Sequence, residues 1–199
     1  PLLDVGCGDG KFLYFLQQEG YSNSFGIDIS KAQIERAKYA GVKNVTVGDA
    51  MEFLRKHPCE YDLISAHDII EHFPKHKVLE FLDLIYKSLV NGGKVLISTL
   101  NAQSLFSARI RYGDFTHEVG FTPTSLAQVL RVAGFKDVRI YPKEPVVLDF
   151  RSGVWFILWK MLKQMLKFCL IIEEGYRGSE GQRYNDILTK AMFAIGRKG

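Results

Sequence analysis

Short apolar runs alternate along the chain with longer stretches in which apolar residues recur every three or four positions. The short runs predict β-strands, and the three-to-four spacing predicts helices that bury one face. The predicted strands are Leu2–Val5, Ser24–Asp28, Val45–Val47, Tyr61–Ser65, Lys94–Thr99, Val138–Tyr141 and Lys190–Arg197. The predicted helices are Lys11–Glu19, Lys31–Ala40, Met51–Lys56, Lys75–Leu89 and Thr124–Ala133. Because the two kinds of element alternate, we expect an α/β fold, with a mainly parallel sheet covered by helices on both faces.

Glycines and long connections divide this pattern. Asn91-Gly92-Gly93 is expected to end the fourth helix, and Gly134 to end the fifth, because glycine tolerates left-handed backbone angles. Leu100–Pro123 and Pro142–Ile187 are too long for simple connections, and such segments are usually functional or disordered. Within the second, Arg177–Arg183 is expected to be a loop. Ligands of parallel sheets bind outside the carboxyl ends of the strands, which is where we look for a site.

The composition fits one domain with a full core. The chain has 199 residues, of which 47% are hydrophobic and 24% charged. A net charge of +4 does not by itself predict nucleic-acid binding, although it is compatible with an anionic membrane surface. Three scattered cysteines predict neither a disulfide framework nor a zinc site and favour a cytoplasmic setting. We expect a single domain over residues 1–199, with a helix missing before the first strand.

A glycine-rich loop, Asp4-Val5-Gly6-Cys7-Gly8-Asp9-Gly10, follows the first predicted strand and opens the first helix. Glycines there allow a tight turn and a close approach of ligand to backbone. The spacing is G-x-G-x-G, and Lys11 stands where a dinucleotide-binding motif has its third glycine. This disfavours a nicotinamide oxidoreductase. Asp4, inside the strand, suits a ligand that carries an ammonium group.

Two further acids stand at the ends of the next two strands. Asp28 ends the second strand, where a carboxylate can accept hydrogen bonds from two ribose hydroxyls. Asp49 ends the third strand, where a carboxylate can accept from an adenine amino group. Each acid alone could equally be a helix cap or a turn residue. Three acids at consecutive strand ends are difficult to attribute to coincidence.

These motifs resemble those of the class I S-adenosylmethionine-dependent methyltransferase family. The resemblance rests on Leu3–Gly10, Gly26-Ile27-Asp28, Gly48-Asp49-Ala50, Tyr61–Ile64 and Leu89–Lys94, and it covers residues 1–141 and the last strand. It implies a doubly wound, Rossmann-like sheet of seven strands, mainly parallel with an antiparallel last strand, and S-adenosylmethionine as the cofactor. The residues it assigns to the cofactor are Asp4, Gly6, Gly8, Asp28, Ile29, Asp49, Ala50 and His67, with Asp4 near the methionine amine. Cys7 is interpreted as a small packing residue.

The segment Ala66–Phe73 follows the fourth strand and resembles the E-x-x-E-H element of ubiquinone-biosynthesis O-methyltransferases and small-RNA 2′-O-methyltransferases. In a helical turn, Asp68, Glu71 and His72 would share one face. Those relatives use the element to hold a divalent metal. His117, on the connection after the fifth strand, is expected to reach the same place.

Methyl transfer to a hydroxyl needs the oxygen to lose its proton. We expect His72 and His117 to act as acid–base catalysts. The alternative is a divalent metal held by Asp68, Glu71, His72 and His117. A third interpretation is that Glu71 and His72 only cap and hydrogen-bond the next helix.

The segment Val154–Leu170 is the most apolar in the chain and lies within a predicted helical insertion at about residues 145–186. Lys160, Lys163 and Lys167 form a polar stripe, which argues against a membrane-spanning helix and favours one lying in the membrane interface. Topology places this insertion over or beside the ligand face. The alternatives are a lid packed on the protein's own core and a dimer contact.

The favoured function is S-adenosylmethionine-dependent methyl transfer to a hydroxyl of a small or lipid-linked acceptor, such as a quinone precursor or a glycan. The protein would then be cytoplasmic, with peripheral contact at the inner membrane face through Val154–Leu170. The alternatives are RNA ribose 2′-O-methylation and a non-catalytic scaffold that binds S-adenosylmethionine. Nucleic acid is not favoured, because no basic strip is interleaved with aromatic residues. The oligomeric state stays open.

Overall fold

A computed structural model describes residues 1–174, 184 and 186–199; the loop expected at Arg177–Arg183 lies outside them. Seven strands form one sheet in the order β3-β2-β1-β4-β5-β7-β6. The strands are β1 (Leu2–Val5), β2 (Ser24–Asp28), β3 (Val45–Val47), β4 (Tyr61–His67), β5 (Leu89–Leu100), β6 (Lys136–Pro142) and β7 (Ala191–Arg197). Strand β7 is antiparallel to both of its neighbours, whereas β1 to β5 pair in parallel. The expected fold class is confirmed.

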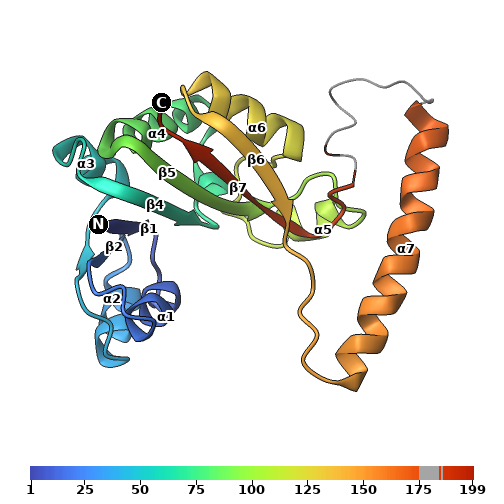
Figure 1. Cartoon of the computed structure of the whole chain (residues 1–199), viewed down its shortest axis with the longest axis horizontal. Helices are drawn as coiled ribbons and strands as arrows, with labels where there is room; N and C mark the ends of the chain where they lie inside the picture. The colour runs from blue at the N-terminus through green and yellow to red at the C-terminus, as the bar shows by residue number, and fades with distance from the viewer. Residues whose placement is uncertain (175–183, 185) are drawn as a thin grey trace.

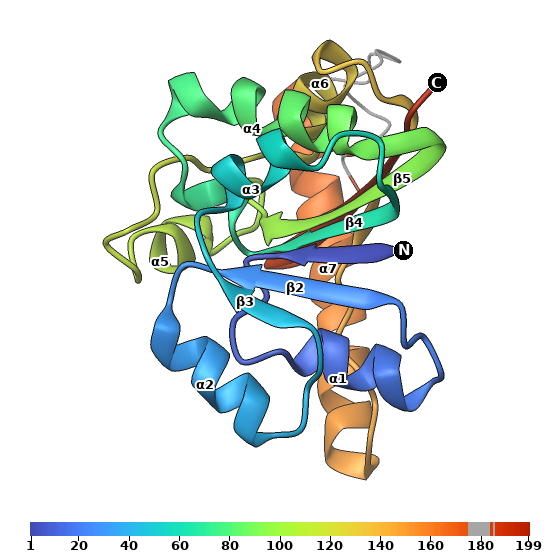
Figure 2. The same ribbon diagram turned by 90° about the vertical axis from the view of Figure 1, so that its left-hand side faces the viewer.

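Helices lie on both faces of this sheet, as Figures 1 and 2 show. Their bounds are α1 (Lys11–Gln18), α2 (Lys31–Tyr39), α3 (Ala50–Lys56), α4 (Lys75–Ser88), α5 (Ser107–Arg111), α6 (Pro123–Val132) and α7 (Phe150–Glu174), and a 3-10 turn, η1, spans Ile70–His72. Helices α3, α4 and α6 cover one face, and α1 and α2 lie on the other. The chain is therefore doubly wound.

Two apolar clusters hold the layers together. On one face, Phe81 and Ile85 of α4 pack with Ile97 of β5 in a large core. On the other face, Leu13 of α1 and Ile34 of α2 belong to a smaller cluster. All five side chains are almost fully buried, and each such burial stabilises the fold by roughly 1.5–3 kcal/mol. These clusters fix the strand ends at which the functional side chains stand.

The expected role of Asn91-Gly92-Gly93 as a helix stop is wrong. Helix α4 already ends at Ser88, and the glycines lie inside β5. There the register with β4 shifts, from Tyr61 opposite Leu89 to Leu63 opposite Lys94. The backbone is crowded at this irregularity, since a Cβ on Gly93 would lie 2.9 Å from the Val90 carbonyl oxygen. The glycines therefore permit a bulge in a strand.

The connections after β5 and β6 contain α5 and α7. Helix α5 is a short helix that the sequence pattern did not predict. Helix α7 is longer than the expected Val154–Leu170 and stands apart from the sheet beside its β6 edge (Figure 1). No helix in the described part of the chain has the length and apolarity to cross a membrane.

Candidate active site

The glycine-rich loop between β1 and α1 has the left-handed backbone that its composition predicts. Gly6, Gly8 and Gly10 have φ values of 71°, 53° and 76°. A Cβ on Gly6 would lie 2.8 Å from Cδ1 of Ile69, whereas one on Gly8 would meet no atom within 4 Å. Gly6 is thus required by packing, and Gly8 borders open space into which a ligand can come.

Cys7 lies between these two glycines and is buried. Burial raises the pKa of its thiol to about 12, and the charges of Asp4 and Asp28 add to the shift. The thiol therefore stays protonated and is no nucleophile. Its Sγ fills the space beside Gly26, where an added Cβ would lie 2.8 Å from it. Packing accounts for this residue.

Asp28, at the end of β2, holds the loop in place. Its Oδ2 accepts a hydrogen bond from the Gly8 amide at 2.8 Å, and its Oδ1 accepts one from the Ser30 amide at 2.8 Å. Each carboxylate oxygen can accept a second bond. The side chain is half-buried. Asp28 is thus oriented by the backbone and retains acceptor capacity for two hydroxyls.

Asp4 lies deeper, inside β1, with 2% of its surface exposed. Its Oδ1 accepts a hydrogen bond from the Ser65 hydroxyl of β4 at 2.7 Å. Burial raises the pKa of Asp4 to about 7; the Ser65 bond opposes this shift and the charge of Asp28 adds to it. Such a carboxyl gains from a cation placed beside it, which fits the methionine amine of the expected cofactor.

Asp49 caps helix α3, because its Oδ1 accepts a hydrogen bond from the Glu52 amide at 2.9 Å. Its other oxygen remains available to a ligand. Ile29, next to Asp28, is 75% exposed although it is apolar, and Ala50 is half-buried at the start of α3. An exposed apolar side chain beside two acids fits the face and amino edge of an adenine ring.

His67, at the end of β4, carries a buried nitrogen in need of a partner. Within the described residues, its Nε2 has no hydrogen-bond partner. Burial lowers the pKa of the imidazole, the charge of Asp68 opposes this shift, and Lys143 lowers the pKa further. The ring packs edge-on against Phe12 of α1, with 4.8 Å between ring centroids. An orphaned buried nitrogen at a strand end fits a ligand contact.

The segment after β4 does not form the helical turn expected for Asp68, Glu71 and His72. Asp68 has a φ of 50° and points its Oδ1 to the hydroxyl of Ser98, at 2.9 Å. Glu71 is 1% exposed and accepts a hydrogen bond from the Thr99 hydroxyl at 2.9 Å. His72 is exposed. The three side chains therefore point to different partners, because a left-handed residue and a short 3-10 turn break the helical spacing.

His72 and His117 come together from two segments, with their ring centroids 4.8 Å apart. The Thr116 hydroxyl donates to Asp114 at 2.7 Å, so it can only accept from Nδ1 of His72, at 2.9 Å. Nδ1 of His117 lies 3.0 Å from the Arg111 carbonyl oxygen, which also only accepts. In neutral form both rings thus carry their proton on Nδ1. Each Nε2 is left with a lone pair that can take a proton.

The proposed metal ligands are not assembled. In the parts of the chain that the structure describes, no three His, Cys, Asp or Glu side chains are grouped so that they could hold a metal ion. The backbone carbonyl of Glu71 instead accepts hydrogen bonds from Glu118 and Val119, at 2.8 and 3.1 Å. These bonds tie the segment that carries His117 to the segment that carries His72.

Sequence reasoning missed the residues that orient the others. Ser65 contacts Asp4, Thr99 contacts Glu71, and Thr116 links His72 to Asp114. Register could have indicated Ser65, since parallel β1 and β4 place it directly beside Asp4. No periodic signal marks Thr116, which lies on an irregular connection.

Comparisons with known proteins agree with this geometry. Residues 1–140 match a family model described as a methyltransferase domain. A ubiquinone biosynthesis O-methyltransferase of Saccharophagus degradans is 29% identical in an alignment of length 151 that covers 68% of this chain and 63% of that protein. A tRNA U34 carboxymethyltransferase of Edwardsiella ictaluri is 27% identical over 74% of this chain and 48% of its own length. The chain thus spans less than two thirds of either relative.

Solved structures include a similar protein. The crystal structure of a SAM-dependent methyltransferase from Archaeoglobus fulgidus superposes with a TM-score of 0.72 at 26% identity. The match covers 99% of this chain and 85% of that one. The likeness therefore extends beyond residues 1–140, which the family model matches.

Proposed function

Because the chain belongs to the class I S-adenosylmethionine-dependent methyltransferase family, we propose that it transfers a methyl group to a hydroxyl of a small or lipid-linked acceptor. A quinone precursor or a glycan fits this description. The observation that carries the proposal is the pair His72 and His117, in which neither Nε2 makes a hydrogen bond within the described residues. Nε2 of His117 lies 4.0 Å from Oδ2 of Asp114. The cofactor supplies an activated methyl group on a sulfonium.

The residues around the glycine-rich loop would bind and orient the donor. Asp28 would accept from the ribose hydroxyls, and Asp4 would sit beside the methionine amine. Ile29 would support the adenine ring, and Asp49 would accept from its amino group. His67 would offer its unpartnered nitrogen to the donor. Positioning of this kind is most of what a direct displacement needs from a protein.

The histidine pair would remove the proton from the acceptor hydroxyl. A neutral hydroxyl is a poor nucleophile near pH 7, and a positioned base raises the rate by about 10²–10⁴-fold. His72 is backed by Thr116 and the Asp114 carboxylate, which would stabilise the imidazolium after it takes a proton. His117 stands beside it with a side chain that is only 11% exposed. We place the base at this pair.

Metal-assisted deprotonation is less well supported. Asp68 and Glu71 are engaged with Ser98 and Thr99, and Glu71 is buried. Within the described residues, these side chains and the two histidines are not grouped so that three of them could hold one ion. No step is therefore assigned to a metal, and chelation in the assay below tests this choice.

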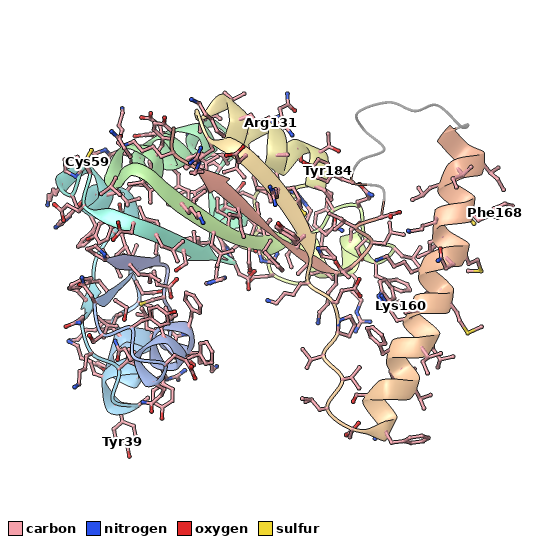
Figure 3. All side chains as sticks on the ribbon, in the orientation of Figure 1. Tyr39, Cys59, Arg131, Lys160, Phe168 and Tyr184 are labelled. Atoms are coloured by element: carbon pink, nitrogen blue, oxygen red, sulfur yellow. The ribbon has the colours of Figure 1, made fainter. Side chains whose placement is uncertain are left out.

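Helix α7 supports an acceptor associated with lipid. Its side turned from the sheet bears large apolar side chains that are 49–67% exposed: Trp155, Leu158, Met161, Met165, Phe168 and Ile172. Figure 3 shows Phe168 on that side. We propose that this face contacts a membrane at its cytoplasmic surface. Two lysines of the polar stripe do not lie at this face. Lys163 and Lys167 face the body of the protein, where they pair with Glu144 and Asp186 at 3.0 and 2.6 Å.

The test is release of S-adenosylhomocysteine with three acceptors: a soluble catechol, a prenylated catechol in detergent, and tRNA. We expect turnover with a catechol. His72→Gln and His117→Gln should lower it about 100-fold or more while calorimetry shows unchanged donor binding. His76→Gln, an exposed histidine on α4, is the matched control and should keep full activity.

Three outcomes would contradict parts of this proposal. Turnover with tRNA alone would move the acceptor class to nucleic acid. Full activity in both histidine variants would remove the base from this pair. Loss of activity on treatment with a chelator, restored by added divalent ion, would favour the metal mechanism.

A further inference from the structure

A pocket of about 900 Å³ lies outside the carboxyl ends of β5 and β6, at the same edge of the sheet as the expected donor site. It is bounded by α5, by the segment after β6 and by α7, and residues just before β7 close it. This volume is within the range of small-molecule sites in proteins. None of the residues assigned above to the donor lines it.

Three cationic side chains from three separate segments line this pocket: Arg109 of α5, Lys143 after β6 and Lys190 before β7. Across the residues that the structure describes, none of them has an ion-pair partner. The acid on the wall, Glu144, is already paired with Lys163 at 3.0 Å. The pocket is therefore cationic, with charges that no carboxylate of the described residues neutralises.

The rest of the wall is mainly apolar, with the hydroxyl residues Ser104 and Thr189 as exceptions. Phe106, Ile110, Pro145 and the ring of Trp159 line it between the cations. An inorganic ion would leave these surfaces in contact with water, whereas a ligand with an apolar part would cover them. Cations and apolar side chains together select an amphipathic anion.

The wall is fixed in place by backbone contacts. The side chain of Asn101 donates to the carbonyls of Ile187 and Thr189, at 2.8 and 2.9 Å, and so positions the residues before β7. The Lys143 amide donates to the Ala191 carbonyl at 3.1 Å. Lys143 is also near enough to His67 for its charge to lower the pKa of that imidazole. An anion held here would lie at the same edge of the sheet as His67, where the donor is expected.

We propose that this pocket binds the phosphate ester group of an amphipathic acceptor and thereby selects the substrate for methylation. Three cations on one pocket wall match a dianion better than a single carboxylate, and the guanidinium of Arg109 can form two parallel bonds to phosphate oxygens. The phosphate would be held by Arg109, Lys143 and Lys190, and the apolar part would lie on Trp159. This inference rests on the proposed function, because it names the class of its acceptor.

The test uses Trp159 as a reporter. The chain has two tryptophans, so Trp155→Phe leaves Trp159 as the only one. In this background the indole fluorescence is titrated with hexyl phosphate and, separately, with hexanol. We expect a saturable change with hexyl phosphate and at least tenfold weaker binding of hexanol. Replacing Arg109, Lys143 and Lys190 with Gln should weaken hexyl phosphate binding at least tenfold, and Lys143→Gln alone should weaken it measurably.

The control is a variant with the same loss of charge elsewhere: Lys38, Lys56 and Arg131, all exposed, are replaced with Gln. It should bind like the parent. Vesicles of phosphatidylcholine with and without phosphatidic acid distinguish the source of the phosphate. Binding to hexyl phosphate in solution indicates a soluble ester, and binding to phosphatidic acid vesicles alone indicates a lipid headgroup.

The inference is overturned if neither phosphate probe binds, if hexanol binds as well as hexyl phosphate, or if the pocket variant binds like the control. Calorimetry with S-adenosylmethionine separates this failure from that of the proposed function. A protein that binds the donor and methylates a catechol, yet ignores both phosphate probes, would keep the function and lose the phosphate site.

Discussion

The two acids nearest the donor loop differ in solvation. Asp28 is half-buried, with both oxygens already accepting backbone amides. Asp4 is buried on all sides and its one side-chain partner is the hydroxyl of Ser65. Burial opposes the charged form of Asp4 and raises its pKa. Substitution of Asp28 should therefore affect mainly donor affinity, and substitution of Asp4 should change how stability depends on pH.

Asp28→Ala should weaken donor binding at least tenfold. The change removes a charged acceptor from the ribose hydroxyls, and each such bond contributes roughly 1.5–3 kcal/mol. It also releases the amides of Gly8 and Ser30. Isothermal calorimetry with S-adenosylmethionine measures the effect, and Glu35→Ala, an exposed acid on α2, should bind as the wild type does. Equal affinity in the two variants would contradict the assignment of Asp28.

Asp4→Asn should change how stability depends on pH. The pKa of Asp4 in the folded chain is about 7, above its ordinary value of 3.8. A carboxyl whose pKa is raised on folding gives its full stabilisation below the unfolded value and loses it as pH rises through the folded value. The wild type should therefore lose up to about 4 kcal/mol between pH 4 and 8 that the variant keeps. Urea unfolding without donor, at several pH values, measures the difference.

The donor should reverse this trend, because a bound ammonium group stabilises the Asp4 carboxylate. Wild-type affinity for S-adenosylmethionine is expected to fall as pH drops below about 7, while the Asp4→Asn variant should bind weakly at every pH. A wild-type affinity that does not change between pH 5.5 and 8 is the result that contradicts this role.

The positions of Asp4, Asp28 and His67 could be predicted because strand ends are visible in the apolar pattern and ligand contacts gather at strand ends. The directions of Asp68 and Glu71 could not. They depend on a left-handed backbone at Asp68, a residue type that adopts this conformation only occasionally. Sequence spacing assumes a helical turn and so places the side chains on one face.

At the scale of helices and strands, the residue that follows β5 holds the residues before β7 that line the cationic pocket. Asn101 immediately follows β5, is 1% exposed and makes three hydrogen bonds with its side chain: two to the carbonyls before β7 and one from the Gln103 amide at 2.9 Å. One residue thus joins the connection after β5 to the start of β7.

Asn101→Ala should lower the free energy of unfolding by about 2–4 kcal/mol, because it leaves buried carbonyl groups without donors. Chemical denaturation measures the loss. Asn91→Ala, an exposed asparagine in β5, is expected to change stability by less than about 0.5 kcal/mol. A similarly small effect at Asn101 would show that its hydrogen bonds to the residues before β7 are not needed for stability.

The apolar pattern also predicted α7 but not its orientation. The spacing of Lys160, Lys163 and Lys167 shows that they share one side of a helix. It does not show whether that side meets water or the protein. Glu144 and Asp186, distant in sequence, decide this by pairing with two of the lysines. Long-range charge pairing is not readable from a local window.

For the molecule as a whole, the exposed apolar side of α7 predicts association with lipid. Replacing Trp155, Met161 and Phe168 with Ser should lower co-sedimentation with phosphatidylcholine–phosphatidylglycerol vesicles at least tenfold. The control replaces Phe15, Tyr21 and Tyr39 with Ser. These side chains are also exposed, on the α1 and α2 side, and the variant should sediment as the wild type does. Donor binding should be unchanged in both.

Sedimentation velocity without lipid tests whether a second copy of the chain, instead of a membrane, covers the apolar face of α7. A dimer that forms with increasing concentration and is lost in the α7 variant would mean that a second copy covers this face. Together with wild-type protein that ignores vesicles, that result would contradict membrane contact.

The place of β7 between β5 and β6 governs the order in which the sheet can be built. During synthesis β6 leaves the ribosome well before β7, yet β7 is its partner in the sheet. Until β7 has been synthesised, β5 has an unpaired edge and β6 has no strand with which to pair. Unpaired strand edges promote aggregation, and pairing across a long sequence separation is slow. A nascent chain that pauses within α7 would therefore need a chaperone more than one that pauses at any earlier helix.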